Sequence, residues 1–262
     1  MNDDDLDQDF DDGAPEYADP GTVSPWALPE ALCRLRFLGD DMYLRMQTTN
    51  IGVVDQFIMR LETDALSKLY EEGGRDMELG IFLSAQSQMW IFAIYELLRT
   101  WRERARGALE LLRKGTLNDR IAALRADKGF RHHGEEALAD QLQALADDSA
   151  IATELEDHLR RIYIPYARLD HLRVALAKHE VKGKRGALAS APGYGRYNAG
   201  CGALDYQIEV GRTILGTINR RDIADEFRAM WNGEAPSLTD IEDFKVFMKG
   251  VDDKDMPDFG DF

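Results

Sequence analysis

The sequence predicts an all-α protein, a helical bundle of six to eight helices with a small β-hairpin insertion. Apolar side chains recur at spacings of three, four and seven residues along most of the chain between residues 26 and 250, which is the helical pattern. One stretch departs from it: residues 182–203 hold too many glycines for a helix. The segment LDYQIEV then alternates like a strand, GRT can turn, and ILGTI can return, which places the hairpin at Leu204 to Ile218.

The longest predicted helix, from Asp76 to Arg113, would extend about 55 Å at 1.5 Å per residue. Its first half is apolar on nearly every side, whereas charged residues gather on one side of its second half. We therefore expect it to start inside a core and to end at the surface. The residues that form its apolar stripe are Leu83, Trp90, Ile94, Leu97, Trp101, Ala105, Ala108 and Leu112.

Shorter helices are expected on both sides of this one. Pro29 is typical of a first helical turn, and Thr48 to Asn50 can cap a helix from Ile51 to Glu71 whose stripe includes Phe57. Pro165 should interrupt or restart a helix. The remaining predicted helices cover residues 117–128, capped by Thr116, residues 135–146, residues 150–163, capped by Ser149, residues 165–180, residues 220–231, capped by Asn219, and residues 238–249, capped by Ser237.

Charge divides the chain into a domain and two tails. Residues 1–30 carry ten acids and no Lys or Arg, so residues 1–25 are expected to be a disordered acidic tail. Residues 26–250 form the predicted helical domain, with a Gly-rich loop and the hairpin at about 182–218, and residues 251–262 form a second acidic tail. Residues 158–221 instead carry twelve Lys or Arg against four acids. The first tail is then either simply solvated, or it binds a protein partner, or it competes with an anionic partner for this basic region.

The overall composition restricts the partners and the compartment. A net charge of −16 argues against general binding to phosphate backbones or anionic membranes. Cys33 and Cys201 are too few and too far apart for a disulfide framework, which favours a cytoplasmic location. The acidic N-terminus lacks a signal-peptide pattern. We expect no membrane span, because polar residues interrupt the most apolar window, residues 81–98: Ser84, Gln86, Ser87 and Gln88.

Metal and nucleotide motifs are absent from the sequence. None of the five histidines follows a Glu by three residues, and His-Glu-x-x-His does not occur, so we expect neither a metal site nor a cofactor. Glu154 and His158 can share a helix face, as many surface pairs do. The GKRG segment at Gly183 lacks the Ser or Thr of a P-loop. No sequence pattern provides a base for Cys201.

The segment DHLRVALAKHE, Asp170 to Glu180, carries an Arg and a His near the end of a predicted helix. With Arg173 and His179 separated by five residues, it resembles the signature of HEPN domains, the higher eukaryotes and prokaryotes nucleotide-binding helical bundles. Many members also carry an acidic residue on an earlier long helix, and Glu96 matches that position. The resemblance covers about a fifth of the chain. It departs from the pattern at Val174, because active members usually have a polar residue there.

The resemblance implies a metal-independent endoribonuclease. His179 would act as the base for a 2′-hydroxyl and Arg173 would stabilise the phosphorane charge. On an ideal helix the two side chains point about 120° apart, so they would meet only where the helix unwinds or across a dimer. The positive charges expected to bind RNA are those of Lys178, Lys182, Lys184 and Arg185.

Each of these residues also has a purely structural interpretation. Arg173 can pair with Asp170, His179 can stabilise a helix C-terminus, and Glu96 can pair with Arg99. Two functional hypotheses follow. One is a HEPN-like protein that binds or cleaves RNA, such as a toxin or defence component. The other is a catalytically inactive helical scaffold or protein-interaction module, expected to be a homodimer joined through the arginine-rich end of the long helix.

Overall fold

The computed structural model describes residues 17–71, 73, 76–127, 129, 132–177, 195–210 and 213–249. Within these ranges the chain forms nine helices and one three-stranded antiparallel sheet. The prediction of an all-α bundle with a small β-hairpin insertion is therefore confirmed, with one helix more than the six to eight expected.

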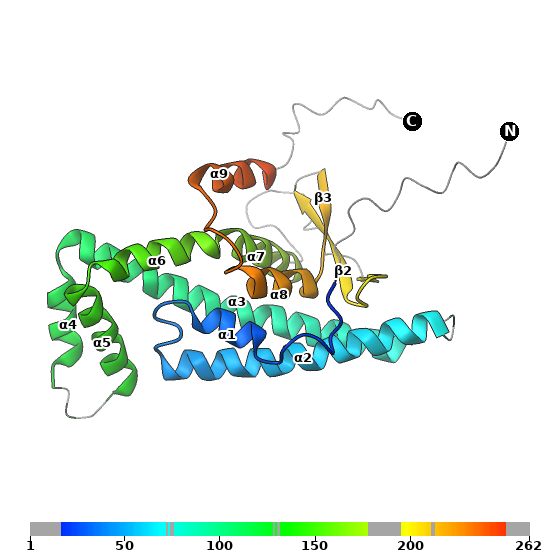
Figure 1. Ribbon diagram of the computed structural model, residues 1–262, viewed down its shortest axis with the longest axis horizontal. Helices are drawn as coiled ribbons and strands as arrows, with labels where there is room; N and C mark the ends of the chain where they lie inside the picture. Colours follow the sequence, from blue (N-terminus) through cyan, green and yellow to red (C-terminus); the bar gives the residue numbers. More distant parts are fainter. Residues whose placement is uncertain are drawn as a thin grey trace.

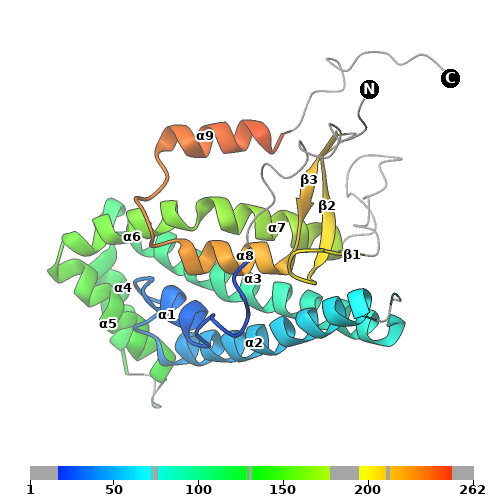
Figure 2. The same cartoon turned by 45° about the vertical axis from the view of Figure 1, so that its right-hand side comes forward.

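Two long antiparallel helices form the base of the molecule, and the shorter elements lie on it (Figure 1). Helices α6 and α7 run along α3, α4 and α5 form one end, and α8 lies between α7 and α1 (Figure 2). The helices are α1 (Ala27–Cys33), α2 (Met42–Glu71), α3 (Met77–Lys114), α4 (Leu117–Arg125), α5 (His133–Asp147), α6 (Ala150–Arg161), α7 (Tyr163–Ala177), α8 (Arg220–Ala229) and α9 (Leu238–Phe247). The strands are β1 (Arg196–Tyr197), β2 (Leu204–Val210) and β3 (Thr213–Ile218).

Helix α3 is the central helix, as the sequence predicts. Asp76 caps its start by accepting a hydrogen bond from the Leu79 N–H, and Gly115 ends it with a φ of 69°. The predicted apolar stripe is buried except for Leu112, which is 38% exposed. The indole N–H of Trp101 donates to the Arg36 carbonyl at 2.6 Å, which ties α3 to the segment that follows α1.

Helix α2 begins nine residues earlier than the predicted Ile51, because Asp41 caps it instead of Thr48 to Asn50. The Asp41 carboxylate accepts hydrogen bonds at 2.9 Å from the backbone N–H groups of Tyr43 and Leu44, and Arg104 of α3 pairs with it at 2.7 Å. Thr48 lies within the helix, where its hydroxyl donates to the carbonyl four residues before it. The predicted start was wrong because a threonine can make this internal bond as well as a cap.

The buried face of α2 also differs from the predicted stripe. Phe57 is 45% exposed, whereas Asp55 and Glu62 are buried. These two acids lie seven residues apart, so they share one side of the helix with Ile58. Sequence periodicity missed this face because it assigned the apolar residues to the core and the acids to the solvent.

Arg220, at the start of α8, neutralises the two buried acids. Its Nη2 atom lies 2.7 and 2.8 Å from the two oxygens of Glu62, and its Nη1 atom is hydrogen-bonded to Asp55. Arg228, about two turns further along α8, is bonded to the other Asp55 oxygen. The Arg220 guanidinium also lies 5.2 Å from the centre of the Trp90 ring, so three helices meet at this ion cluster.

The other predicted helix boundaries give a mixed result. Asn219 and Ser237 form capping boxes with Asp222 and Asp240, which confirms both caps. Thr116 and Ser149 occupy the N-cap positions as predicted, but neither makes a side-chain capping bond. Asp148 instead accepts from the backbone N–H of Ala150. The chain restarts as a helix at Tyr163, with Pro165 in its first turn, as predicted.

Residues 17–25, expected to belong to a disordered tail, lie against the rest of the fold. The Tyr17 hydroxyl donates to Asp222 at 2.6 Å, and Arg221 donates to the Ala18 carbonyl at 2.6 Å. Strands β2 and β3 pair as the predicted hairpin with a bulge at Ile208, and β1 extends the sheet on the β2 side. Residues 1–16 and 251–262, the rest of the predicted tails, lie outside the described residues.

We expect Arg220→Ala to lower the free energy of unfolding by about 3–5 kcal/mol, because it leaves two buried carboxylates without their main partner. Urea denaturation followed by circular dichroism measures the change. Arg99→Ala removes an arginine from an exposed pair and should leave the unfolding curve nearly unchanged. Equal losses in the two variants would contradict a structural role of the buried cluster.

His158 gives the fold a pH dependence. Its Nδ1 atom accepts the Arg36 N–H at 3.0 Å, and its ring packs edge-on against Trp231. Burial lowers the pKa of His158 below its ordinary 6.5, and the neighbouring carboxylates of Asp157 and Glu154 offset this only in part. The unfolded chain therefore binds the proton more readily than the folded one.

The stability contributed by neutral His158 is accordingly present above pH 6.5 and is lost as the pH falls through the lower, folded pKa. We expect the free energy of unfolding to decrease between pH 7.5 and 5.5 in the native chain. His158→Asn keeps an acceptor for the Arg36 N–H but does not titrate, so the decrease should be smaller in this variant. Urea titrations at several pH values test this, and parallel pH profiles would refute the assignment.

Candidate functional site

Only part of the predicted RNA-cleaving site falls within the described residues. Arg173 is described, whereas His179 and the basic residues Lys178, Lys182, Lys184 and Arg185 lie outside. The Arg173 Nη2 atom pairs with Asp170 at 2.7 Å, and its guanidinium carbon lies 4.0 Å from the centre of the Tyr95 ring. Arg173 thus joins α7 to α3 by a stacking contact and an ion pair.

Glu96 lies one residue from Tyr95 but faces solvent. Its side chain is 58% exposed and pairs at 2.7 Å with Arg99, which also binds Glu103. Successive residues of a helix point about 100° apart, so Tyr95 faces α7 while Glu96 does not. Within the described part of the chain no hydrogen bond or ion pair joins Glu96 to Arg173. The structural interpretations of both residues are therefore the ones observed.

The arginine-rich end of α3, expected to form a dimer interface, is occupied by contacts within the chain. Arg102 lies 3.8 Å from the centre of the Tyr166 ring, and Arg104 pairs with Asp41. Helices α4 to α6 surround this end of α3 (Figure 1). These two arginines hold the bundle together, whereas Arg106 and Arg113 at the same end are exposed, so a dimer interface there stays a prediction.

The opposite half of α3, together with α2, carries apolar residues on its outer side. We call this surface the outer stripe: Met46, Asn50, Val53 and Phe57 on α2, and Phe82, Ala85, Met89 and Phe92 on α3. Both rows have alternating spacings of three and four residues, the spacing of a helix seam. Five large members of the stripe are exposed, with 44–65% of their surface accessible: Met46, Val53, Phe57, Phe82 and Met89.

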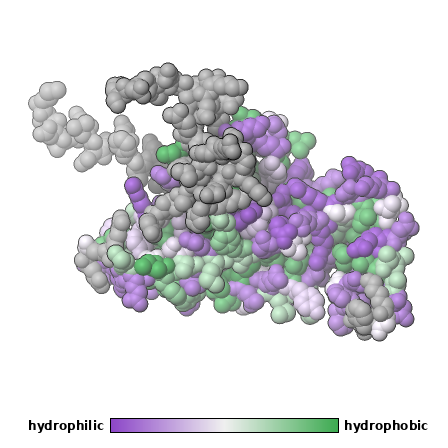
Figure 3. All heavy atoms as spheres, turned by 180° about the vertical axis from the view of Figure 1, so that it is seen from behind, coloured by the Kyte–Doolittle hydropathy of each residue, from purple (hydrophilic) through white to green (hydrophobic). Residues whose placement is uncertain are grey.

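The two rows form one continuous surface. The rings of Phe57 and Phe82 meet edge to face with centroids 6.4 Å apart, although both residues are exposed. Seen from behind, hydrophobic side chains gather along the lower part of the body, over the region where Figure 1 draws α2 and α3 (Figure 3). Charged residues resume at Arg60 on α2 and at Glu96 on α3.

The outer stripe was not predicted, because a helix that is apolar on nearly every side of its first half indicates burial in a core. The available signal was a second row at helix-seam spacing, opposite the stripe of Trp90 and Trp101. By length and composition alone α3 could cross a membrane, a test that core helices of soluble proteins also pass, and 44% of its apolar window is buried inside the protein.

The other reactive groups in the described ranges form no catalytic arrangement. Burial raises the pKa of Cys201 to about 12, so its thiol is protonated and inert near neutral pH. A polar cavity beside α8 contains Asp205, Asp222 and Glu226, but each already accepts a hydrogen bond or pairs with an arginine. Among the described residues, no three His, Cys, Asp or Glu side chains are grouped so that they could hold a metal ion.

We expect Arg173→Ala to lower the free energy of unfolding by about 1–2 kcal/mol, through loss of the Tyr95 stacking and of the Asp170 pair. Chemical denaturation measures the effect. Arg113→Ala, at an exposed position of α3, is the matched control and should change stability little. An unchanged unfolding curve for Arg173→Ala would mean that the guanidinium is not structural and is free for another role.

Comparisons with protein-family models, with curated proteins and with solved structures found no match to this chain. The resemblance to HEPN domains therefore stays a prediction from the sequence, and the function has to be argued from the surface and the contacts described above.

Proposed function

We propose that this chain is a catalytically inactive helical scaffold that forms a homodimer through the outer stripe. The observation that carries the proposal is the pair of exposed apolar rows, both at helix-seam spacing, on two long antiparallel helices. Apolar residues at this spacing normally pack against another helix. Within the described part of the chain, these rows face solvent.

The area of the stripe fits a dimer. Each of its five large exposed residues leaves roughly 100 Å² uncovered, about half the surface of a side chain of this size, which gives roughly 500 Å² in total. A patch of this size lies at the upper end of what monomers expose. A standard interface buries about 800 Å² per partner, of which about 60%, or roughly 480 Å², is apolar.

The shape of the stripe favours a second copy of the same chain. Two antiparallel helices present a surface that a twofold rotation can place on itself, with α3 of one copy against α2 of the other. The result would be a four-helix layer. Ala85, between Phe82 and Met89, leaves space for a large side chain from the partner. Asn50 lies within the α2 row, where a polar residue can fix the register of paired helices.

The charges around the stripe favour protein over lipid. Binding to an anionic membrane requires an excess of basic residues beside the apolar face. Here both signs are present: the exposed Arg45 and Arg60 flank the α2 row, while α3 continues beyond the stripe with Glu96 and Glu103, both paired with Arg99. The chain as a whole carries a net charge of −16. Thirteen of its acids lie in residues 1–16 and 251–262, outside the helical domain, so the repulsion between two domains is smaller than the total suggests.

We expect the native chain to have about twice its monomer mass of 29.6 kDa in light scattering, and Val53→Glu to weaken the dimer at least about a hundredfold. The substitution occurs twice in a twofold interface, and each copy needs to cost only about 1.4 kcal/mol. Val246→Glu is the matched control. Val53 is 61% and Val246 59% exposed on their helices, but Val246 belongs to α9, away from the stripe.

Phe57→Glu and Phe247→Glu form a second matched pair with the same expectation. A native chain that stays monomeric at about 100 μM, or dimers that survive both stripe variants, would overturn the proposal. Binding to anionic vesicles that is lost in Val53→Glu would assign the stripe to lipid instead.

Digestion of single-stranded RNA without metal ions distinguishes the RNA-cleaving hypothesis from the scaffold proposal. Cleavage that disappears in both Arg173→Ala and His179→Ala would replace the scaffold proposal with the HEPN-like one, since folded variants would have lost chemistry alone. Circular dichroism of the two variants checks that they are folded. Absence of cleavage and of any RNA shift at low salt supports the scaffold.

A further inference from the structure

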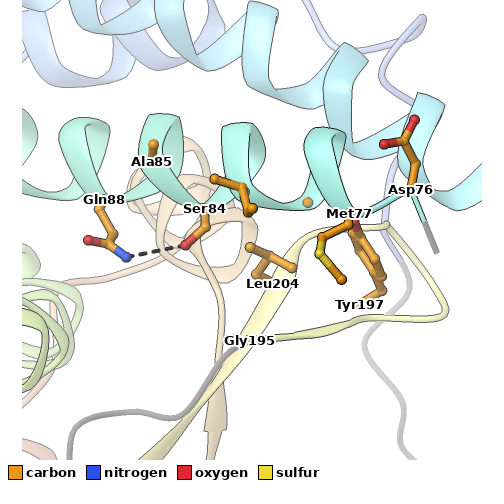
Figure 4. Close-up of a pocket in the computed structure, with 10 residues that line it drawn as sticks. Asp76, Met77, Ser84, Ala85, Gln88, Gly195, Tyr197 and Leu204 are labelled. Atoms are coloured by element: carbon orange, nitrogen blue, oxygen red, sulfur yellow. Dashed lines mark hydrogen bonds between the residues drawn. The ribbon is translucent and has the colours of Figure 1, made fainter.

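A cavity of about 500 Å³ lies beside the first half of α3, between this helix and the segment that contains β1 and the start of β2. Its wall is mainly apolar, and Met77, Tyr197 and Leu204 surround it from both sides (Figure 4). The volume falls within the usual range of small-molecule sites. The scaffold proposal assigns no role to this cavity.

Gly80 shapes one side of the cavity. A Cβ atom at this position would lie 2.7 Å from the Tyr197 hydroxyl oxygen, so the absence of a side chain lets that ring lie against α3. Tyr197 and Leu204 come from paired strands, in which they are direct register partners. The opening is thus held between a helix and a hydrogen-bonded strand pair.

Two neutral polar side chains line the cavity, and a buried tyrosine hydroxyl lies next to them. The Gln88 amide donates to the Ser84 hydroxyl at 3.2 Å, and both side chains line the cavity (Figure 4). Tyr206, two residues beyond Leu204 on the same side of β2, is only 3% exposed, and among the described residues Ser84 and Gln88 lie near its hydroxyl but none forms a hydrogen bond of good geometry with it. Burial raises the pKa of Tyr206, while the nearby Ser84 and Gln88 side chains act in the opposite direction.

The buried Tyr206 hydroxyl is unusual, because buried polar groups are nearly always paired. A hydroxyl, an amide and a phenol can together donate to and accept from one ligand group. Among the described residues of the lining, Asp76 alone is charged, and it is paired with Lys68 at 2.6 Å. This polar part of the cavity therefore suits a neutral polar group and would leave a carboxylate without a compensating cation.

We propose that this cavity binds a small neutral amphiphile, with its hydrocarbon part between Met77, Ile81 and Leu204 and its single amide or hydroxyl group at Ser84, Gln88 and Tyr206. The apolar wall provides most of the binding, and the three polar groups select the neutral head group. The cavity shares only Ala85 with the outer stripe, and the proposed ligand contacts do not involve that residue, so the proposal does not rest on dimerisation.

Octanamide and octanoate test the head-group selection, since they share a hydrocarbon chain and differ in charge. Titration of the full chain is followed through the methyl signals of Met77 and Leu204 in two-dimensional NMR spectra. We expect saturable shifts with octanamide and at least tenfold weaker binding of octanoate. Equal affinities, or shifts that spread over the outer stripe and spare these two methyl groups, would overturn the proposal.

Two variants test the placement of the ligand. Tyr206→Phe should weaken octanamide binding at least fivefold without lowering the melting temperature, because the removed hydroxyl has no well-aligned hydrogen-bond partner among the described residues. Tyr43→Phe, an exposed tyrosine on α2, should change neither. Ser84→Leu should block the cavity, whereas Ser67→Leu on the surface of α2 should not.

The dimer variant separates this inference from the proposed function. Val53→Glu should bind octanamide as the native chain does, whether or not the native chain is dimeric. Full affinity in Tyr206→Phe would show that the hydroxyl does not bind the ligand, and a lower melting temperature would show that it has a structural role. Either result would overturn the proposed site.

Discussion

The buried ion cluster of Arg220, Glu62 and Asp55 determines how the halves of this chain are joined. The two acids lie on α2, and the arginine arrives from α8, more than 150 residues later in the sequence. A buried carboxylate is unfavourable without a partner, so α2 can bury this face only when α8 is docked. This constraint couples the helical hairpin to the β-hairpin that precedes α8.

Docking of α8 also fixes the surfaces from which function is proposed. It directs the face of Ile58 and Glu62 toward the interior, and the opposite side of α2, with Val53 and Phe57, is left on the surface. The β-hairpin that leads into α8 places Leu204 in the lining of the cavity and the buried Tyr206 next to Ser84 and Gln88 of α3. The outer stripe and the cavity are thus two consequences of one packing arrangement.

For the candidate site residues, the sequence correctly predicted only local ion pairs, while their role in cleavage stays a prediction. The pairs Arg173–Asp170 and Glu96–Arg99 are three residues apart on their helices, so sequence spacing was sufficient to propose them. The predicted dimer surface at the arginine-rich end of the long helix stays a prediction, but spacing could not tell which of its arginines stack on aromatic rings of the same chain. Arg102 lies on Tyr166, a residue 64 positions away.

The sequence by itself determined the all-α class, the position of the hairpin, most helix segments and the capping boxes at Asn219 and Ser237, since these follow from contacts within a few residues. Only the tertiary structure decided which apolar residues are buried. Phe57 and Trp90 have equally apolar side chains, but one lies on the surface and the other in the core. The physical reason is that a helix with more than one apolar face buries the face whose polar residues find partners, and those partners come from distant parts of the chain.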